Sequence, residues 1–273
     1  MLTFNPRPWG AFSTEVNRLV DAAAVEADKE RKPRDYLGGS RLGEECLRKL
    51  AYEFHQTPKD SGRGFDGRLL RIFQRGHDAE RRVVEQLLRA GWLVVRGDND
   101  DERTSFSSGK LAGHADGYVA SGPPLKWIVY PCLLEIKCVN ANWWGRFDRE
   151  GVARTHPGYF VQMQTYMAYL KQTMCWFLVE NADTCELHSE IVNLDLRAAQ
   201  EASDRAARVI ATREPEEMPR AVRSRTAQIC RECFFQDRCW SSPATDVVIR
   251  SEAQKAGIPD WVKKLHERGH AKQ

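Results

Sequence analysis

The stretch Cys132-Leu-Leu-Glu135-Ile-Lys137-Cys138-Val139 places an acid and a base inside an otherwise apolar run. Residues two apart in a β-strand lie on the same face, so Glu135 and Lys137 would share a face while Ile136 points to the other. Such a strand is usually buried, and a buried carboxylate or ammonium is costly unless it is paired or bound to a metal. The pattern indicates either a Glu-Lys ion pair at a sheet edge or part of a charged site.

A second acid, Asp116, lies in Leu111-Ala-Gly-His114-Ala-Asp116-Gly-Tyr-Val119, among small and apolar residues. If the two segments form adjacent strands, Asp116 and Glu135 lie side by side. Two carboxylates at that separation repel each other unless a divalent cation lies between them. The two acids therefore predict a site for a divalent metal ion, with His114 as a rival ligand on the same segment.

Two segments with helical spacing offer further side chains. His77 and Glu80 are three residues apart and share one helical face, so either could supply a third ligand, although either could also be a solvated surface residue. Gln162 and Tyr166 are four apart and also share a face. We expect this second pair to contact a phosphate or the attacking water.

Four cysteines have the spacing of a metal site. Cys230, Cys233 and Cys239 form a C-x-x-C pair with a third cysteine six positions further on, and Cys46 is the best candidate for a fourth ligand. Three thiolates with this spacing can surround one metal centre, and a tetrahedral site or an iron-sulfur cube needs four. Spacing alone leaves zinc and an iron-sulfur cluster both open.

The composition is that of a globular protein. The 273 residues are 42% hydrophobic and 29% charged, with a net charge of +3, which does not by itself indicate a nucleic-acid-binding protein. There is no apolar run near bilayer length and no signal-peptide pattern at the N-terminus, so we expect a cytoplasmic location. Cysteines are reduced there, which favours metal ligation over disulfides.

The periodicity predicts one α/β domain over residues 1–273. Expected helices cover residues 12–30, a short segment from Cys46 to Phe54, and residues 69–90, 157–171, 194–212 and 258–268. Expected strands cover residues 92–95, 111–120, 128–139, 175–179 and 187–192. The three clustered cysteines fall in a segment predicted to be irregular.

The order helix with His77, strand with Asp116, strand with Glu135-x-Lys137, helix with Gln162-x-x-x-Tyr166 resembles the PD-(D/E)XK nuclease superfamily. The resemblance is closest to the RecB-like branch, and one cysteine before the core with three after it is similar to the iron-sulfur nucleases of the AddB type and the CRISPR-associated exonucleases. The superfamily's proline is absent, because Ala115 precedes Asp116. The resemblance implies a restriction-endonuclease-like core over residues 69–192, with a central mixed β-sheet flanked by helices. It also implies an iron-sulfur subdomain built from residues 40–54 and 226–242.

The resemblance assigns roles to individual residues. His77, Asp116, Glu135 and the carbonyl of Ile136 would bind Mg²⁺ or Mn²⁺, and Lys137 would orient the water or stabilise charge on the phosphate. Gln162 and Tyr166 would complete the catalytic site. Cys46, Cys230, Cys233 and Cys239 would hold a structural 4Fe-4S cluster.

The expected function is that of a metal-dependent DNA exonuclease acting on single-stranded ends, in recombination, repair, phage DNA processing or CRISPR adaptation, with a possible protein partner from one of those pathways. The alternatives are an endonuclease of the same superfamily and an inactive nucleic-acid-binding or scaffold subunit with a nuclease-like fold. The segment Asn142-Trp-Trp-Gly-Arg146 could stack on and grip single-stranded DNA. Its two tryptophans could equally close the core.

Overall fold

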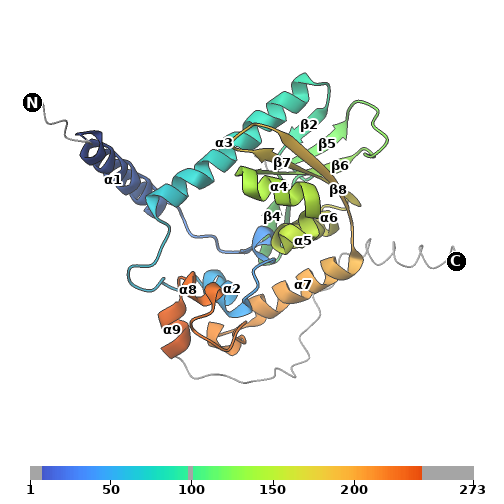
Figure 1. Ribbon diagram of the computed structural model, residues 1–273. Coiled ribbons are helices and arrows are strands. Elements are labelled where there is room, and N and C mark those ends of the chain that lie inside the picture. Colours follow the sequence, from blue (N-terminus) through green and yellow to red (C-terminus); the bar gives the residue numbers. More distant parts are fainter. Residues whose placement is uncertain (1–7, 98–100, 242–273) are drawn as a thin grey trace, which may run out of the picture.

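The computed structural model describes residues 8–97 and 101–241. The predicted helix over residues 258–268 lies outside these residues, as does the last residue of the predicted cysteine subdomain. The fold is α/β, with mixed sheets flanked by helices (Figure 1). No helix in the described part of the chain is long and apolar enough to span a bilayer.

The larger sheet has five strands in the order β2-β5-β6-β7-β8. Its central pair, β6 and β7, is parallel, and the other neighbours are antiparallel. Because β6 and β7 are covered on both faces, the first five residues of β6 and all residues of β7 except the first are buried. The strands are β2 (Leu93–Arg96), β5 (Gly117–Ser121), β6 (Cys132–Val139), β7 (Met174–Asn181) and β8 (Leu187–Asn193).

Alternation along β6 divides the core into two layers. Leu134 and Ile136 pack with Val83 and Val84 of α3 (Gly67–Arg89). Leu133 faces the other way and packs with α4 (Ala141–Glu150) and α6 (Pro157–Tyr169), which are joined by α5 (Val152–Thr155). Glu135 and Lys137 follow the parity of Leu133 and therefore lie on the α6 face of the sheet.

Side-chain caps fix where the flanking helices begin. Asp66, Asn140 and Asp195 accept hydrogen bonds from backbone amides in the first turns of α3, α4 and α7 (Leu196–Ala211), as preferred N-cap residues do. His156 does the same for α6, accepting from the Tyr159 amide through Nδ1 at 3.2 Å. Pro157 follows it at the first helical position, where the missing N–H costs nothing.

A second, three-stranded sheet has the order β1-β4-β3. Its apolar residues pack with those of α2 and α7, so this sheet joins the N-terminal segment to the main core. The elements here are β1 (Leu37–Gly38), the 3-10 turn η1 (Gly39–Arg41), α2 (Leu47–Phe54), β3 (Ser105–Ser108) and β4 (Leu111–His114).

The cysteine segment is helical in part. Residues predicted to be irregular form α8 (Gln228–Arg231) and α9 (Gln236–Ser241), which follow the 3-10 turn η2 (Pro215–Glu217). Figure 1 shows α8 and α9 beside α2, away from the larger sheet. The segment that carries α2 therefore lies beside the last elements of the described chain.

The structure corrects several expected elements. The strand predicted over 111–120 is two strands, β4 and β5, in different sheets, and the strand predicted over 128–139 begins at Cys132. α4 and β3 were not predicted. Helix α1 (Pro8–Lys29) forms as expected, but its apolar face is exposed: Phe12 is 68% exposed and Leu19 is 54% exposed. Figure 1 shows α1 extending away from the body beside the start of α3, where Gly67 lies against the backbone of Asp21.

Candidate active site and cysteine cavity

Asp116 lies in the break between β4 and β5, where the chain passes from one sheet to the other. The ladder between β5 and β6 ends at the pair Gly117 and Leu134. Beyond that pair the Asp116 carboxylate replaces a backbone partner, and its Oδ2 accepts the N–H of Ile136 at 2.7 Å. The hydrogen bond holds Asp116 against β6, beside Glu135.

Glu135 is 1% exposed and its two oxygens are in different situations. Oε1 accepts from the Lys137 ammonium and from Gln162 Nε2, the latter at 2.6 Å. Oε2 is buried and has no hydrogen-bond partner. Lys137 also donates to the Ile136 carbonyl at 3.0 Å, and its Nζ lies 3.7 Å from Asp116 Oδ2. The structure thus brings Asp116, Glu135, Ile136, Lys137 and Gln162 together.

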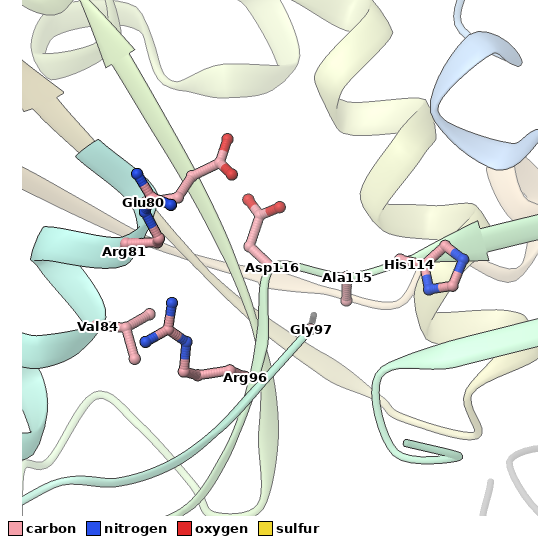
Figure 2. A pocket seen from close by; sticks show the side chains of 8 residues that line it. All are labelled: Glu80, Arg81, Val84, Arg96, Gly97, His114, Ala115 and Asp116. Atoms are coloured by element: carbon pink, nitrogen blue, oxygen red, sulfur yellow. The ribbon is translucent and has the colours of Figure 1, made fainter. Parts of the chain in front are cut away.

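The acid that α3 brings to this site is Glu80. A cavity of about 160 Å³ separates α3 from the Asp116 segment, and Figure 2 shows the carboxylates of Glu80 and Asp116 approaching each other there. The lining residues are Glu80, Arg81, Val84, Arg96, Gly97, His114, Ala115 and Asp116.

His77, the predicted ligand, does not line that cavity. Its side chain is 62% exposed, and its Nδ1 lies 3.3 Å from Glu80 Oε2. The two residues share a helical face as the spacing predicted, but Glu80 is one turn closer to Asp116. Sequence spacing could not distinguish them, because residues three apart on a helix are equivalent until the helix is docked.

Burial and mutual repulsion perturb these carboxylates. Burial, reinforced by the charge of Asp116 and partly opposed by Lys137, raises the pKa of Glu135 to about 8. The same two causes, in the same order, raise the pKa of Glu80. Lys137 has a pKa raised well above its ordinary value, because the charges of Glu135 and Asp116 outweigh its burial, and it stays charged. When all three acids are ionised, their negative charge exceeds what Lys137 alone compensates.

This donor set fits a hard divalent cation. Carboxylate and carbonyl oxygens are what Mg²⁺ and Mn²⁺ prefer, and the unpaired Oε2 of Glu135 is an acceptor that still needs a positive partner. Within the described residues, no set of three or more histidine, cysteine, aspartate or glutamate side chains is arranged to hold a metal ion as it stands. The carboxylates would have to close around an incoming cation.

Tyr166 is close to the site but points into the core. It is 4% exposed and its ring packs edge-on against Phe106. Gly39 and Gly113 both lie so close to this ring that a Cβ on either would overlap it. Tyr166 therefore links the N-terminal segment to α6.

A group of aromatic rings next to Lys137 was not predicted as part of the site. The Lys137 ammonium lies 5.3 Å from the ring centroid of Tyr159, which in turn stacks on His156 at 3.6 Å and 9°. Trp143 follows at 6.3 Å from His156 and is 38% exposed, whereas Trp144 packs on the core and donates to the Val179 carbonyl. Trp144 thus packs on the core, as one alternative expected of both tryptophans, whereas DNA stacking by Trp143 stays a prediction. One feature of the sequence could have indicated these rings: Tyr159 lies one helical turn before Gln162 and therefore shares its helical face.

The four predicted cysteines line one small cavity between α2, α8 and α9. Cys233 and Cys239 are buried, and Cys46 and Cys230 are half-buried. The cavity measures about 20 Å³, which is room for one water-sized sphere. Burial raises the pKa of Cys233 to about 11 and raises that of Cys230. Without a metal these two thiols are protonated at neutral pH.

An arginine is buried beside this cavity. Arg48 of α2 is 1% exposed, donates to the Met218 and Glu216 carbonyls at 2.6 and 2.8 Å, and has Nη1 at 3.9 Å from Cys239 Sγ. Arg48 therefore links α2 to the segment around η2 and to Cys239. The remaining cysteines lie outside this cavity, and none of the eight forms a disulfide.

Comparison with known proteins gives likeness at the level of solved structures alone. No protein-family model and no curated protein matches the sequence. An alkaline exonuclease from Laribacter hongkongensis (LHK-Exo) is 17% identical with a TM-score of 0.44, over 71% of this chain and 91% of that one. The same enzyme in complex with dAMP gives a TM-score of 0.43. A phage-related exonuclease from Haemophilus somnus is 14% identical with a TM-score of 0.41, over 60% of this chain and 77% of that one. Likeness of this degree does not assign the chain to a family, so the function rests on the site's own residues.

Proposed function

We propose that this protein is a metal-dependent deoxyribonuclease, an exonuclease acting on single-stranded ends. The observation that carries the proposal is the buried Glu135 oxygen without a partner, on a carboxylate that also interacts with Asp116 and Glu80. A structural ion pair would need none of this, because Lys137 alone would compensate one acid. Three acids, Asp116, Glu135 and Glu80, surround the single ammonium of Lys137, and this ratio supports a cation site.

Asp116, Glu135 and Glu80 would hold Mg²⁺ or Mn²⁺, with the Ile136 carbonyl as a further oxygen donor. When bound, the metal supplies Lewis-acid stabilisation of the phosphate and lowers the pKa of a water molecule. Direct ligation by His77 stays a prediction. In the structure its imidazole is placed to hydrogen-bond Glu80 and so to orient that carboxylate.

Lys137 would bind the scissile phosphate. An ammonium has three N–H donors, and the hydrogen bonds to Glu135 and to the Ile136 carbonyl use two of them. The third is available to a phosphate oxygen, whose negative charge grows in the transition state. Gln162 fixes Oε1 of Glu135 and leaves Oε2 for the cation.

The rival function is that of an inactive nucleic-acid-binding or scaffold subunit. Such a subunit gains nothing from burying Glu135 and Lys137, because a buried ion pair is seldom more stable than apolar residues of similar size. The charged set therefore supports catalysis. An endonuclease would use the same residues and has to be distinguished by its products.

End-labelled single-stranded and duplex DNA, incubated with and without Mn²⁺, tests the proposal. We expect wild-type protein to shorten single strands from an end, and Glu135→Gln to abolish cleavage while Glu85→Gln, at an exposed position on the same helix as Glu80, leaves it unchanged. Comparing 5′- and 3′-labelled strands gives the polarity. Cleavage of circular single strands would show an endonuclease, and full activity in Glu135→Gln would refute the site.

We also infer that the four cysteines hold a structural metal–thiolate centre. The one-plus-three cysteine pattern supports a 4Fe-4S cluster, whereas the 20 Å³ cavity favours a single Zn²⁺, because a cluster would require the cysteine side chains to turn outward. Metal analysis and visible absorption of protein purified without oxygen decide between them. Brown colour with four irons per chain supports the cluster, one zinc per chain supports the ion, and neither metal refutes the centre.

A further inference from the structure

A row of aromatic rings lies between the candidate catalytic Lys137 and an open groove. It consists of Tyr159, His156 and Trp143. Tyr159 has Lys137 at 5.3 Å from its ring centroid, and His156 stacks on the tyrosine. Trp143, the most exposed of the three rings, lies 6.3 Å from His156 between ring centroids, and the Arg146 guanidinium lies 4.7 Å from the Trp143 ring centroid. Neither His156 nor Tyr159 is fully buried, so part of this ring surface is accessible from the groove.

The groove has a volume of about 770 Å³, within the range of sites that hold drug-sized ligands. One wall is the start of α6, with His156, Gly158 and Tyr159. The other wall comes from the segments that carry the cysteines: residues 40–49 and 222–232. The walls meet where Gly43 packs directly against Gly158, so closely that a Cβ at position 43 would overlap the Gly158 backbone.

The far wall is acidic. Glu44, Glu45 and Glu232 line it together with Arg41 and Lys49, and both of these cations are already paired with Glu44. Glu45 and Glu232 are exposed. A phosphate backbone would be repelled from this wall, whereas the amino groups of adenine, cytosine and guanine can donate to carboxylates. The groove therefore suits bases better than phosphates.

We propose that the Tyr159–His156 stack, with Trp143 beside it, is a nucleobase-stacking subsite that holds an unpaired nucleotide next to the scissile phosphate. The proposal rests on the proposed nuclease function. It assigns the preference for single-stranded over duplex DNA to these aromatic rings. Aromatic side chains stack on any base, so the subsite would distinguish unpaired from paired nucleotides but would not distinguish one base from another. A base inside a duplex has both faces occupied by its neighbours and cannot use it.

Variants can separate stacking from folding. His156 also caps α6 through Nδ1, so His156→Asn keeps a side-chain acceptor at a preferred capping position and removes the ring. Trp143→Leu removes the third ring at a half-exposed position. Trp127→Leu is the matched control, because Trp127 is 67% exposed and lies outside the groove.

Each protein is tested with a labelled single-stranded oligonucleotide and with versions in which one terminal nucleotide at a time is abasic. Binding is measured by fluorescence anisotropy in EDTA, and cleavage of the same strands is followed with Mn²⁺. For wild type we expect one abasic position to weaken binding by about 5- to 150-fold, the range of base–aromatic stacking. In His156→Asn and Trp143→Leu, intact strands should bind more weakly and that abasic penalty should shrink. Trp127→Leu should behave as wild type.

The outcomes distinguish the two proposals. If wild type cleaves DNA but its abasic penalty persists in His156→Asn and Trp143→Leu, the stacking subsite is refuted and the nuclease function stands. If the penalty depends on the rings but no strand is cleaved, the subsite stands and the nuclease function is refuted. If wild type binds no single strand, the subsite is refuted, and cleavage of DNA then decides the function separately.

Discussion

Gln162 Nε2 on α6 lies 2.6 Å from Glu135 Oε1 on β6, so an uncharged side chain holds one oxygen of a carboxylate whose other oxygen has no partner. The amide orients the acid without neutralising it. The candidate site thus depends on the packing of α6 against β6 in the core. This relationship gives the first of four predictions.

Gln162→Leu should weaken Mn²⁺ binding by about 10- to 100-fold, the usual effect of removing a residue that orients a metal ligand. The fold should be retained, because leucine is similar in size and the position is 7% exposed. Isothermal titration with Mn²⁺ measures the effect. Gln86→Leu, at an exposed position on α3, is the control, and equal affinity in both variants would contradict the role of Gln162.

Metal binding should strengthen as the pH rises towards 8. The pKa of Glu135 is about 8 in the folded protein against 4.5 for an unperturbed glutamate, so between these values the folded state binds more protons than the unfolded state. Stability of the metal-free protein should therefore fall as pH rises through this window, and added Mn²⁺ should stabilise it progressively more. Thermal unfolding in EDTA and in Mn²⁺ measures both trends. The control is Glu135→Gln, whose stability in EDTA should depend less steeply on pH than that of wild type. An identical pH dependence in the two proteins would contradict the raised pKa of Glu135.

Gly97→Ala should damage both stability and cleavage. A Cβ at position 97 would overlap the carbonyl oxygen of Ala115, immediately before Asp116, so the chain just after β2 can approach this segment only because position 97 has no side chain. We expect a loss of about 1–3 kcal/mol, as for overpacking elsewhere, and a lower cleavage rate from a displaced Asp116. Gly76→Ala is the opposite control. It lies inside α3 with open space around it and should stabilise the protein by about 0.5–1 kcal/mol.

Cys239→Ser should cost stability and bound metal together. The loss should be on the order of 2–5 kcal/mol if the cavity holds a structural centre, similar to the loss of a cross-link in a small domain. Denaturant unfolding, with metal content measured on the same samples, checks this. Cys185→Ser, at an exposed position outside the cavity, should change neither, and a Cys239→Ser protein with full metal content would contradict the assignment.

The sequence predicted the order of the core elements because their periodicity is local. It failed at Ala115 and Asp116, where an apolar pattern runs on without interruption while the chain crosses between sheets. The cause is tertiary: Asp116 hydrogen-bonds Ile136, twenty residues away. The polar strand β3 was missed for a similar reason, since its pairing with β4 defines it.

Helix α4 could have been recognised. Asn140 is a favourable N-cap residue and its side chain accepts the Trp143 amide, but the two tryptophans suggested a binding segment and hid the helix. The charged residues on β6 were found because an acid and a base in an apolar strand are conspicuous. His156 and Tyr159 were not, because their relation to Lys137 depends on how α6 docks on the sheet.

The buried contact between Arg48 and Cys239 spans 191 residues. A ribosome adding about 5–20 residues per second would need roughly 10–40 s to make the chain between them. During that time the α/β core can form, but Cys46 is not yet joined by Cys230, Cys233 and Cys239. Acquisition of metal at this cavity would therefore report that synthesis has reached the last cysteine, and a truncated chain would be recognisable by its failure to retain the metal.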